Sequence, residues 1–196
     1  MLDSVDISIY SNFKILPEET QTSLLLLNKK YKNTKILVNM MPELLKIFPN
    51  SHLQIVGDGE DLVNIKSAIT LGNLGKSVEL TGKITDEELR LRYSSCDIYV
   101  SASQFEVCPV PTLEAMACGK PLLLYSIEPH KEIVEVSGAG STFSSFEPAE
   151  IVKKIEEVYR NKITYSKSAL LFAESHSWAE ICKQISNIYD EISIVK

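Results

Sequence analysis

The sequence predicts an α/β fold: a parallel, Rossmann-like sheet with helices on both faces. Two observations support this prediction. Short apolar stretches alternate along the chain with longer segments in which apolar residues recur at helical spacing. The first apolar stretch, Ser23–Leu27, is continuous, as expected for a strand buried on both faces of a parallel sheet. Strands that alternate with helices are joined by right-handed crossovers, which place helices over both faces of the sheet.

Each expected element follows from its own local pattern. The helix at 86–94 begins at a capping box, in which Thr85 and Glu88 satisfy backbone N–H groups. A short helix starts at Pro111 and ends before Gly119, because proline suits the first helical position and glycine the left-handed position past the end. Strands are expected at 23–27, 52–56, 78–81, 97–100, 121–125 and 141–143, and further helices at 36–48, 61–71, 131–136, 149–159, 165–174 and 178–192.

The composition limits the class of protein. The chain has 196 residues, of which 44% are hydrophobic, and this suits one domain with a full core. Its formal net charge of −6 argues against nonspecific binding to nucleic acid. No apolar run is long enough to span a membrane and no signal-peptide pattern opens the sequence, so we expect a cytoplasmic location. The four cysteines lack the paired spacing of metal or redox sites and are expected to be reduced thiols.

The most informative segment carries two glutamates around the start of the short helix. Glu106 precedes the helix, and Glu114 lies in its first turns with seven residues between the two. Carboxylates accept hydrogen bonds from sugar hydroxyls, and the amides at a helix start attract phosphate. The segment therefore favours a ligand that is both polyhydroxylated and phosphorylated, with Val110, Pro111 and Thr112 beside it at the helix start.

This segment resembles the Glu–seven residues–Glu motif of the retaining glycosyltransferases of family 4. Leu113–Pro121 also resembles the Leu-Glu-Ala-Met-Ala-x-Gly-x-Pro run of that family, and the resemblance extends from about Ile7 to the last helix. It implies the C-terminal half of a GT-B architecture that binds a nucleotide-diphosphate sugar, with Glu106 at the donor sugar and Glu114 at the ribose. The sequence departs from the family at Val107–Val110, where the family usually reads Gly-Phe-Gly-Leu.

A cluster of lysines follows the first predicted strand. Its members are Lys29, Lys30, Lys32 and Lys35. Ligands of an open parallel sheet bind outside the carboxyl ends of its strands, so this cluster in an acidic protein suggests a bound anion. A solvated loop is the alternative. The resemblance implies that Lys29 and Lys35 bind the donor diphosphate and stabilise the charge that develops on it, with Lys30 left open as a substitute for Lys29.

Glycines mark the ends of the next two strands. Gly57 and Gly59 follow the second strand without the third glycine of a dinucleotide-binding fingerprint. Gly82 and Ile84 follow the third strand. The resemblance implies that both segments line the donor cleft, with Ile84 against the nucleotide base. A tight turn is the alternative for each.

Two further segments are given structural expectations. The stretch from Glu128 to Glu132 resembles a Pro-x-x-Glu turn that helps to shape the sugar pocket in the family, and His130 within it is expected to be an exposed loop histidine. The last helix carries an apolar stripe that is expected to pack into the core: Trp178, Ile181, Ile185, Ile188, Tyr189 and Ile192. The resemblance implies that such a helix also braces an N-terminal domain, so that part of the stripe would be exposed in this chain.

The resemblance also implies a division of the chain. Residues 1–22 are expected to be the remnant of an interdomain linker, because Ser4–Tyr10 resembles the segment with which family members leave their N-terminal domain. Residues 23–176 would form the Rossmann-like nucleotide-sugar-binding domain. Residues 177–196 would form a helix that braces the absent N-terminal domain.

The leading functional hypothesis is the donor-binding domain of a retaining glycosyltransferase. The full-length enzyme would move a hexose-type sugar to a glycan or lipid-linked acceptor, without a metal or other cofactor, in the cytoplasm or at the cytoplasmic face of the membrane. Its partners would be the nucleotide sugar, the acceptor and its own N-terminal domain, and the isolated chain would be inactive.

Three other hypotheses were weighed. A glycosidase also uses two carboxylates, although a lysine-rich phosphate loop has no purpose there. A non-catalytic nucleotide- or sugar-binding module is supported by the departure at Val107–Val110. An oxidoreductase would need glycines where lysines follow the first strand.

Overall fold

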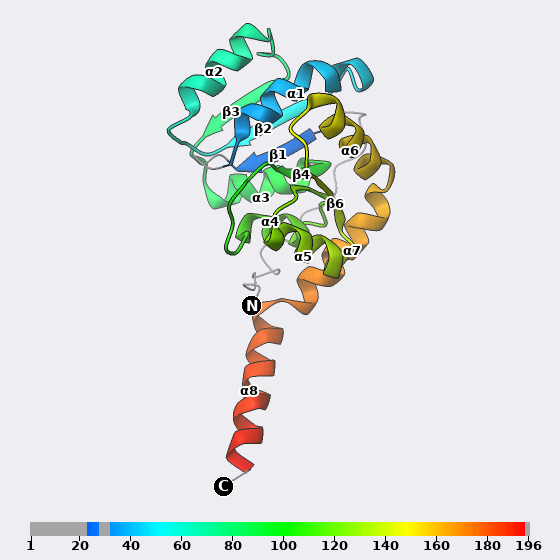
Figure 1. The fold of residues 1–196 in the computed structure, drawn as a ribbon. Coiled ribbons are helices and arrows are strands. Elements are labelled where there is room, and N and C mark those ends of the chain that lie inside the picture. The colour runs from blue at the N-terminus through cyan, green and yellow to red at the C-terminus, as the bar shows by residue number, and fades with distance from the viewer. Residues whose placement is uncertain (1–22, 28–31, 195–196) are drawn as a thin grey trace.

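The computed structural model describes residues 23–27 and 32–194, and within them a six-stranded parallel sheet lies between two layers of helices (Figure 1). The predicted fold class is confirmed. The strands are β1 (Ser23–Leu27), β2 (His52–Val56), β3 (Val78–Gly82), β4 (Ile98–Ser101), β5 (Leu122–Tyr125) and β6 (Gly140–Phe143). The helices are α1 (Thr34–Ile47), α2 (Leu62–Leu71), α3 (Asp86–Ser95), α4 (Val110–Ala117), α5 (Glu128–Ser137), α6 (Pro148–Arg160), α7 (Lys162–Ser175) and α8 (Trp178–Ile194).

The strands follow the order β3-β2-β1-β4-β5-β6, which is the order of a Rossmann fold. All paired strands run parallel. The chain moves outward in one direction from β1 to β3 and in the other direction from β4 to β6. The order therefore reverses between β1 and β4, and a ligand of such a sheet binds outside the carboxyl ends of the strands at this switch point.

The two faces of the sheet are covered by different helices. Leu53 and Ile55 of β2 pack into a cluster with α1, α2 and α6, whereas Val56 packs into a second cluster with α3, α4, α5 and α7. β4 divides in the same way, with Ile98 on the first face and Tyr99 on the second. Side chains of a strand alternate between faces, so continuous apolar runs supply both cores at once.

The predicted helix ends agree with the local sequence signals. The Thr85 hydroxyl accepts a 3.2 Å hydrogen bond from the backbone N–H of Glu88, which confirms the cap of α3. Gly119 follows α4 with a φ of 67°, the left-handed conformation expected past a helix end. One segment was predicted wrongly, because the stretch from Glu128 to Glu132 forms the first turn of α5 and not a separate turn.

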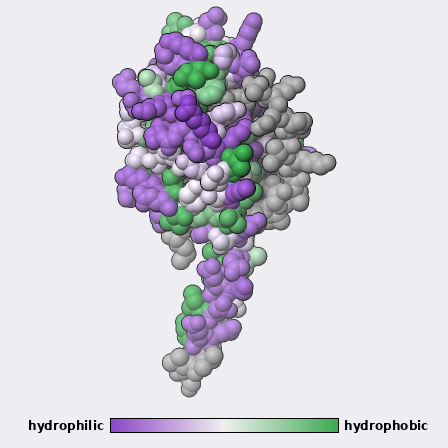
Figure 2. Space-filling view, turned by 90° about the vertical axis from the view of Figure 1, so that its right-hand side faces the viewer, coloured by the Kyte–Doolittle hydropathy of each residue, from purple (hydrophilic) through white to green (hydrophobic). Residues whose placement is uncertain are grey.

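The last helix, α8, projects from the body of the domain (Figure 1). The predicted packing into the core is wrong for most of its apolar stripe, whereas the predicted exposure of part of the stripe is what the structure shows. Trp178 is 54% exposed and Tyr189 is 68% exposed. Figure 2 shows hydrophilic and hydrophobic residues side by side along this projecting segment. Among the described helices, none is long and apolar enough to cross a membrane. The predicted linker at residues 1–22 lies outside the described part of the chain.

Candidate functional site

The switch point brings together a lysine and a glutamate from two loops. Lys32 lies between β1 and α1, and Glu106 lies between β4 and α4. The Lys32 ammonium donates to a carboxylate oxygen of Glu106, and the two side chains are 7% and 8% exposed. A buried ion pair of this kind is stable only while both partners remain, because either charge alone would be costly to bury. The pair is therefore a charged centre at the position where the fold places a ligand.

The residue after Lys32 is held in place by a contact with the loop after β4. Asn33 adopts a left-handed backbone conformation, with a φ of 47°, directly before α1. Its side-chain amide donates to the carbonyl oxygen of Ala102 at 3.3 Å, which ties this loop to the loop after β4. Within the second loop, the Ser103 hydroxyl donates to the carbonyl of Phe105 at 3.0 Å. These two hydrogen bonds therefore lie beside the ion pair in the sequence, at Asn33 and at Ser103 and Phe105.

The second predicted glutamate is hydrogen-bonded to a tyrosine. Glu114 on α4 accepts a 3.0 Å hydrogen bond from the Tyr93 hydroxyl of α3, which also lies 3.2 Å from the Pro111 carbonyl. Burial raises the pKa of the Tyr99 hydroxyl on β4, and the negative charges of Glu106 and Glu114 raise it further. Both carboxylates therefore contribute to the electrostatic environment of Tyr99.

The helix start offers less to an anion than the sequence suggested. The N–H of Val110 donates to the Cys108 carbonyl at 3.0 Å, and the N–H of Thr112 donates to the Pro109 carbonyl at 2.8 Å. Pro111 has no N–H to donate. The first backbone donors of α4 are therefore engaged within the turn, and what the helix start retains is the partial positive charge of its dipole.

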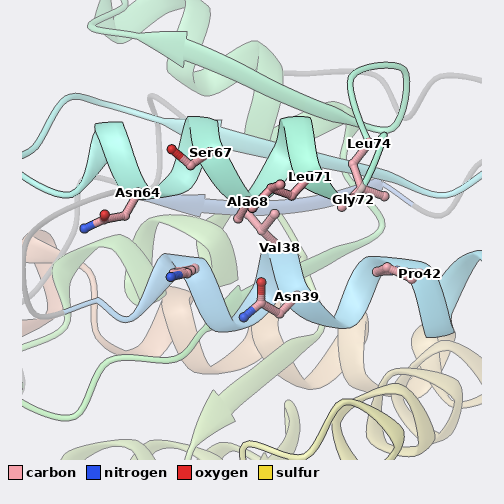
Figure 3. A pocket seen from close by; sticks show the side chains of 10 residues that line it. Val38, Asn39, Pro42, Asn64, Ser67, Ala68, Leu71, Gly72 and Leu74 are labelled. Atoms are coloured by element: carbon pink, nitrogen blue, oxygen red, sulfur yellow. The ribbon is translucent and has the colours of Figure 1, made fainter.

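Lys35 points into a different part of the molecule. It is exposed in the first turn of α1 and lines a groove of about 380 Å³ between α1 and α2. Figure 3 shows Val38, Asn39 and Pro42 of α1 facing Asn64, Ser67, Ala68 and Leu71 of α2 across this groove. The structure joins Glu106 to Lys32 and not to Lys35. Lys29 and Lys30 lie outside the described residues.

The glycine segments lie at the ends of β2 and β3. Gly57 and Gly82 have φ values of 101° and 67°, and the N–H of Gly57 donates to the carbonyl of Gly82 at 2.8 Å. The N–H of Gly59 donates to the Asp58 carboxylate at 2.8 Å. Ile84 is half-buried against the core cluster that contains Val56 and Tyr93. These residues therefore shape the rim next to the switch point through their backbone.

His130 is buried, and its prediction as an exposed loop residue is wrong. Its exposed fraction is 0%, and it occupies the third position of α5, after the carboxyl end of β5. Its Nδ1 lies 2.7 Å from the Tyr125 carbonyl oxygen. Burial lowers the pKa of His130, the hydrogen bond to Tyr125 and the Glu106 charge oppose this, and the Lys32 charge lowers it further.

The described residues contain no group of three or more His, Cys, Asp or Glu side chains placed to hold a metal ion. The four cysteines form no disulfide, as expected of reduced thiols. Burial raises the pKa of Cys96 to about 12 and that of Cys118 to about 11, so neither is a nucleophile near neutral pH.

Sequence reasoning missed two residues of this site. Lys32 belongs to the predicted lysine cluster, but its pairing with Glu106 was not recognised. The available sequence signal was the next residue, Asn33, because asparagine tolerates the left-handed conformation. Tyr93 was not singled out. Its signal was the one aromatic residue of a mostly polar helix, because a buried tyrosine needs a hydrogen-bond partner for its hydroxyl.

Curated relatives are glycosyltransferases from several organisms. An uncharacterized glycosyltransferase of Haemophilus influenzae is 28% identical over 162 residues, which are 81% of this chain and 45% of the relative. The alpha-monoglucosyldiacylglycerol synthase of Acholeplasma laidlawii is 26% identical over 163 residues, which are 82% of this chain and 40% of the relative. The chain therefore spans less than half the length of these relatives.

Solved structures share the fold. Sucrose-phosphate synthase from Thermosynechococcus elongatus superimposes with a TM-score of 0.82 at 20% identity, over 99% of this chain and 52% of that one. The pneumococcal O-GlcNAc transferase GtfA, solved in complex with UDP and GlcNAc, gives a TM-score of 0.76 at 20% identity, over 97% of this chain and 38% of that one. These similarities show the fold of a GT-B glycosyltransferase C-terminal domain.

The family model described as "Glycosyl transferases group 1" matches residues 17–170, which include β1, both glutamates and the whole switch point. The chain belongs to the glycosyl transferases group 1 family.

Proposed function

We propose that this chain is the nucleotide-diphosphate-sugar-binding domain of a retaining glycosyltransferase of family 4. The observation that carries the proposal is the buried Lys32–Glu106 pair at the switch point, with Glu114 contributing to the same electrostatic environment at Tyr99. A cation and two carboxylates at this position match a ligand with an anionic diphosphate and several hydroxyls.

Each residue has a distinct role in this proposal. The diphosphate pairs with the Lys32 ammonium, which breaks the ion pair between Lys32 and Glu106. The Glu106 carboxylate then accepts hydrogen bonds from hydroxyls of the donor sugar. Glu114 accepts from the ribose. Glu106 positions the sugar and does not transfer a proton, whereas Lys32 stabilises the negative charge that gathers on the leaving diphosphate. Lys29 stays a candidate for a further phosphate contact, whereas Lys35, which lines the groove between α1 and α2, is not required for diphosphate binding in this proposal.

The backbone around the pair supplies the remaining parts of the donor site. The segments at Gly57, Gly59 and Gly82 line the cleft, and Ile84 lies toward the base. The start of α4, with Val110, Pro111 and Thr112, contributes through its dipole, since the N–H groups of Val110 and Thr112 are engaged in the turn. A lysine and a helix dipole can hold a diphosphate without a metal, so we propose that no metal or other cofactor is needed.

The acceptor site belongs to a partner domain in this proposal. The matched relatives are more than twice as long as the shared region, which leaves room for an N-terminal domain. The exposed apolar side chains of α8 would pack against that domain, with 177–196 as the brace and 1–22 as the linker. The complete enzyme would transfer a hexose-type sugar to a glycan or lipid-linked acceptor at the cytoplasmic membrane face, and the isolated chain would bind donor without turnover.

A thermal-shift and calorimetric screen tests this proposal. The chain is titrated with UDP, GDP and ADP, with their glucose, N-acetylglucosamine and mannose conjugates, and with uridine, guanosine and adenosine as phosphate-free controls. A ligand at a hundred times its dissociation constant stabilises the fold by about 2.7 kcal/mol. We expect one diphosphate and its conjugates to shift unfolding while its nucleoside does not. Absence of a shift with every diphosphate and conjugate would overturn the proposal.

A non-catalytic nucleotide- or sugar-binding module is the second candidate. It is favoured by the engaged amides of Val110 and Thr112 and by Pro109, which has no N–H where the family usually has a glycine-rich loop. The two candidates separate in the full-length protein. Transfer of sugar from the donor that binds supports the enzyme, and binding without any transfer or donor hydrolysis supports the module.

A further inference from the structure

His130 has a buried nitrogen without a partner. Its Nδ1 lies 2.7 Å from the carbonyl oxygen of Tyr125, and a carbonyl can only accept, so Nδ1 carries the proton. The neutral ring then has a lone pair at Nε2. Within the described part of the chain, Nε2 is buried and has no hydrogen-bond partner. Buried polar atoms are nearly always paired, so an unpaired one needs an explanation.

The position of this nitrogen connects it with the donor site. His130 follows β5, the strand next to β4, so it lies one strand beyond the switch point. The charged groups that act on its ring are Glu106 from the loop after β4 and Lys32 from the loop after β1, besides the Tyr125 carbonyl at the end of β5. Since burial opposes protonation of the ring, Nε2 is a hydrogen-bond acceptor near neutral pH.

The chemistry of the missing partner is that of a hydrogen-bond donor. An ionised diphosphate offers only acceptor oxygens and cannot pair with a bare nitrogen. A sugar hydroxyl can donate to Nε2 while a neighbouring hydroxyl donates to Glu106. Two acceptors beside one ammonium therefore match the two hydroxyls and the diphosphate of a nucleotide sugar better than they match a free nucleotide.

We propose that His130 is a specificity-determining residue, whose Nε2 accepts a hydrogen bond from a hydroxyl of the transferred sugar. This inference rests on the proposed function. In the unliganded chain Nε2 is closed to solvent, so the sugar reaches it when the diphosphate draws Lys32 away from Glu106 and the pair opens. His130 then distinguishes the sugar conjugate from the free diphosphate, which does not reach it.

A pair of matched variants tests this role by calorimetry. His130→Asn keeps an N–H that can donate to Tyr125 and removes the atom at the Nε2 position, whereas His130→Gln keeps an acceptor there. The ligands are the diphosphate and the sugar conjugate that bind the wild-type chain, for example UDP with UDP-glucose or GDP with GDP-mannose. We expect His130→Asn to lower the affinity for the conjugate about 2- to 13-fold. The diphosphate should bind within about twofold of wild type, and His130→Gln should recover most of the loss.

The outcomes separate this inference from the proposed function. The inference is overturned if His130→Asn lowers the affinities for diphosphate and conjugate equally, or lowers neither. Either result leaves the proposed function standing. Failure of the wild-type chain to bind any diphosphate overturns both. If His130→Asn does not fold, the ¹⁵N resonance of Nε2 in the wild-type chain decides: it should move with the conjugate and stay in place with the diphosphate, and the reverse contradicts the inference.

Discussion

The two sides of the switch point differ in the chemical groups that form them, side chains on one side and backbone on the other. On the side of β4 and β5, the site consists of buried and half-buried side chains: Glu106 with Lys32, Glu114 with Tyr93, and His130. On the side of β2 and β3, it consists of backbone, with Gly57 and Gly82 in left-handed conformations and bonded to each other. The first side recognises a ligand through charge and hydrogen bonds, and the second provides shape. Substitutions should therefore act through lost partners on one side and through backbone strain on the other.

The largest effect is expected from breaking the Lys32–Glu106 pair. Lys32→Met or Glu106→Gln should each lower the free energy of unfolding by about 3–5 kcal/mol, because each leaves one buried charge without its partner. The double variant should lose much less than the sum, since it buries no charge. Urea denaturation of the wild-type chain, the two single variants and the double variant measures these free energies of unfolding.

Lys35→Met serves as the control for that cycle. Lys35 is exposed, so its removal should change the free energy of unfolding by less than about 0.5 kcal/mol. Additive effects of the Lys32 and Glu106 substitutions would show that the two side chains are not coupled, and the charged centre described above would then be absent.

A medium effect is expected on the backbone side. Gly82→Ala should destabilise the fold by about 1–2 kcal/mol, because φ is 67° there although no atom lies within 4 Å of the added Cβ. Gly75→Ala is the matched control: it also has open space around the Cβ, and its φ lies outside the left-handed region. A loss of the same size in both variants would mean that strain at Gly82 is not the cause.

A smaller effect is expected at the tyrosine that holds Glu114. Tyr93→Phe removes the hydroxyl bonded to Glu114 and Pro111 and should cost about 1 kcal/mol in unfolding free energy. Tyr159→Phe, at a ring that packs against Phe48, should change stability little. Thermal and urea unfolding of both variants give the comparison, and equal losses would contradict the role of Tyr93.

The pH dependence of stability tests the burial of His130. Its pKa is lowered in the folded chain, whereas an unfolded histidine titrates near pH 6.5. The stability gained from the neutral ring is therefore fully present above about pH 6.5 and is lost as the pH falls through the lower, folded pKa. Urea unfolding at pH 7.5 and 5.5 should show a loss that is smaller in His130→Gln. An identical loss in the two proteins would contradict the burial.

Much of the fold could be predicted because short strands rich in apolar residues alternate with segments of helical periodicity. β2 was predicted at its observed bounds, and Thr85 and Gly119 marked helix ends correctly because capping depends on near neighbours in the sequence. The stripe on α8 was also recognised as a periodic pattern. Its packing was predicted wrongly, since periodicity shows that a face is apolar but not which surface covers it.

The site could be predicted only in part, for a similar reason. Glu106 and Glu114 belong to a local motif, so the sequence alone singles them out as candidates. The choice between Lys32 and Lys35 depends on the left-handed conformation of Asn33 and its bond to Ala102, which lies 69 positions away in the sequence. The burial of His130 likewise depends on tertiary packing at the end of β5. Contacts between distant segments leave no periodic signal along the chain.

The most direct test of the central claim is a comparison of diphosphate binding between two lysine variants. The double variant with Lys32→Met and Glu106→Gln keeps the buried pair uncharged and Lys35 intact, and Lys35→Met keeps the pair intact. By calorimetry, we expect the affinity for the diphosphate that binds the wild-type chain to fall about tenfold or more in the double variant, and to stay within about twofold in Lys35→Met. Unchanged affinity in the double variant, with a loss in Lys35→Met, would contradict the account.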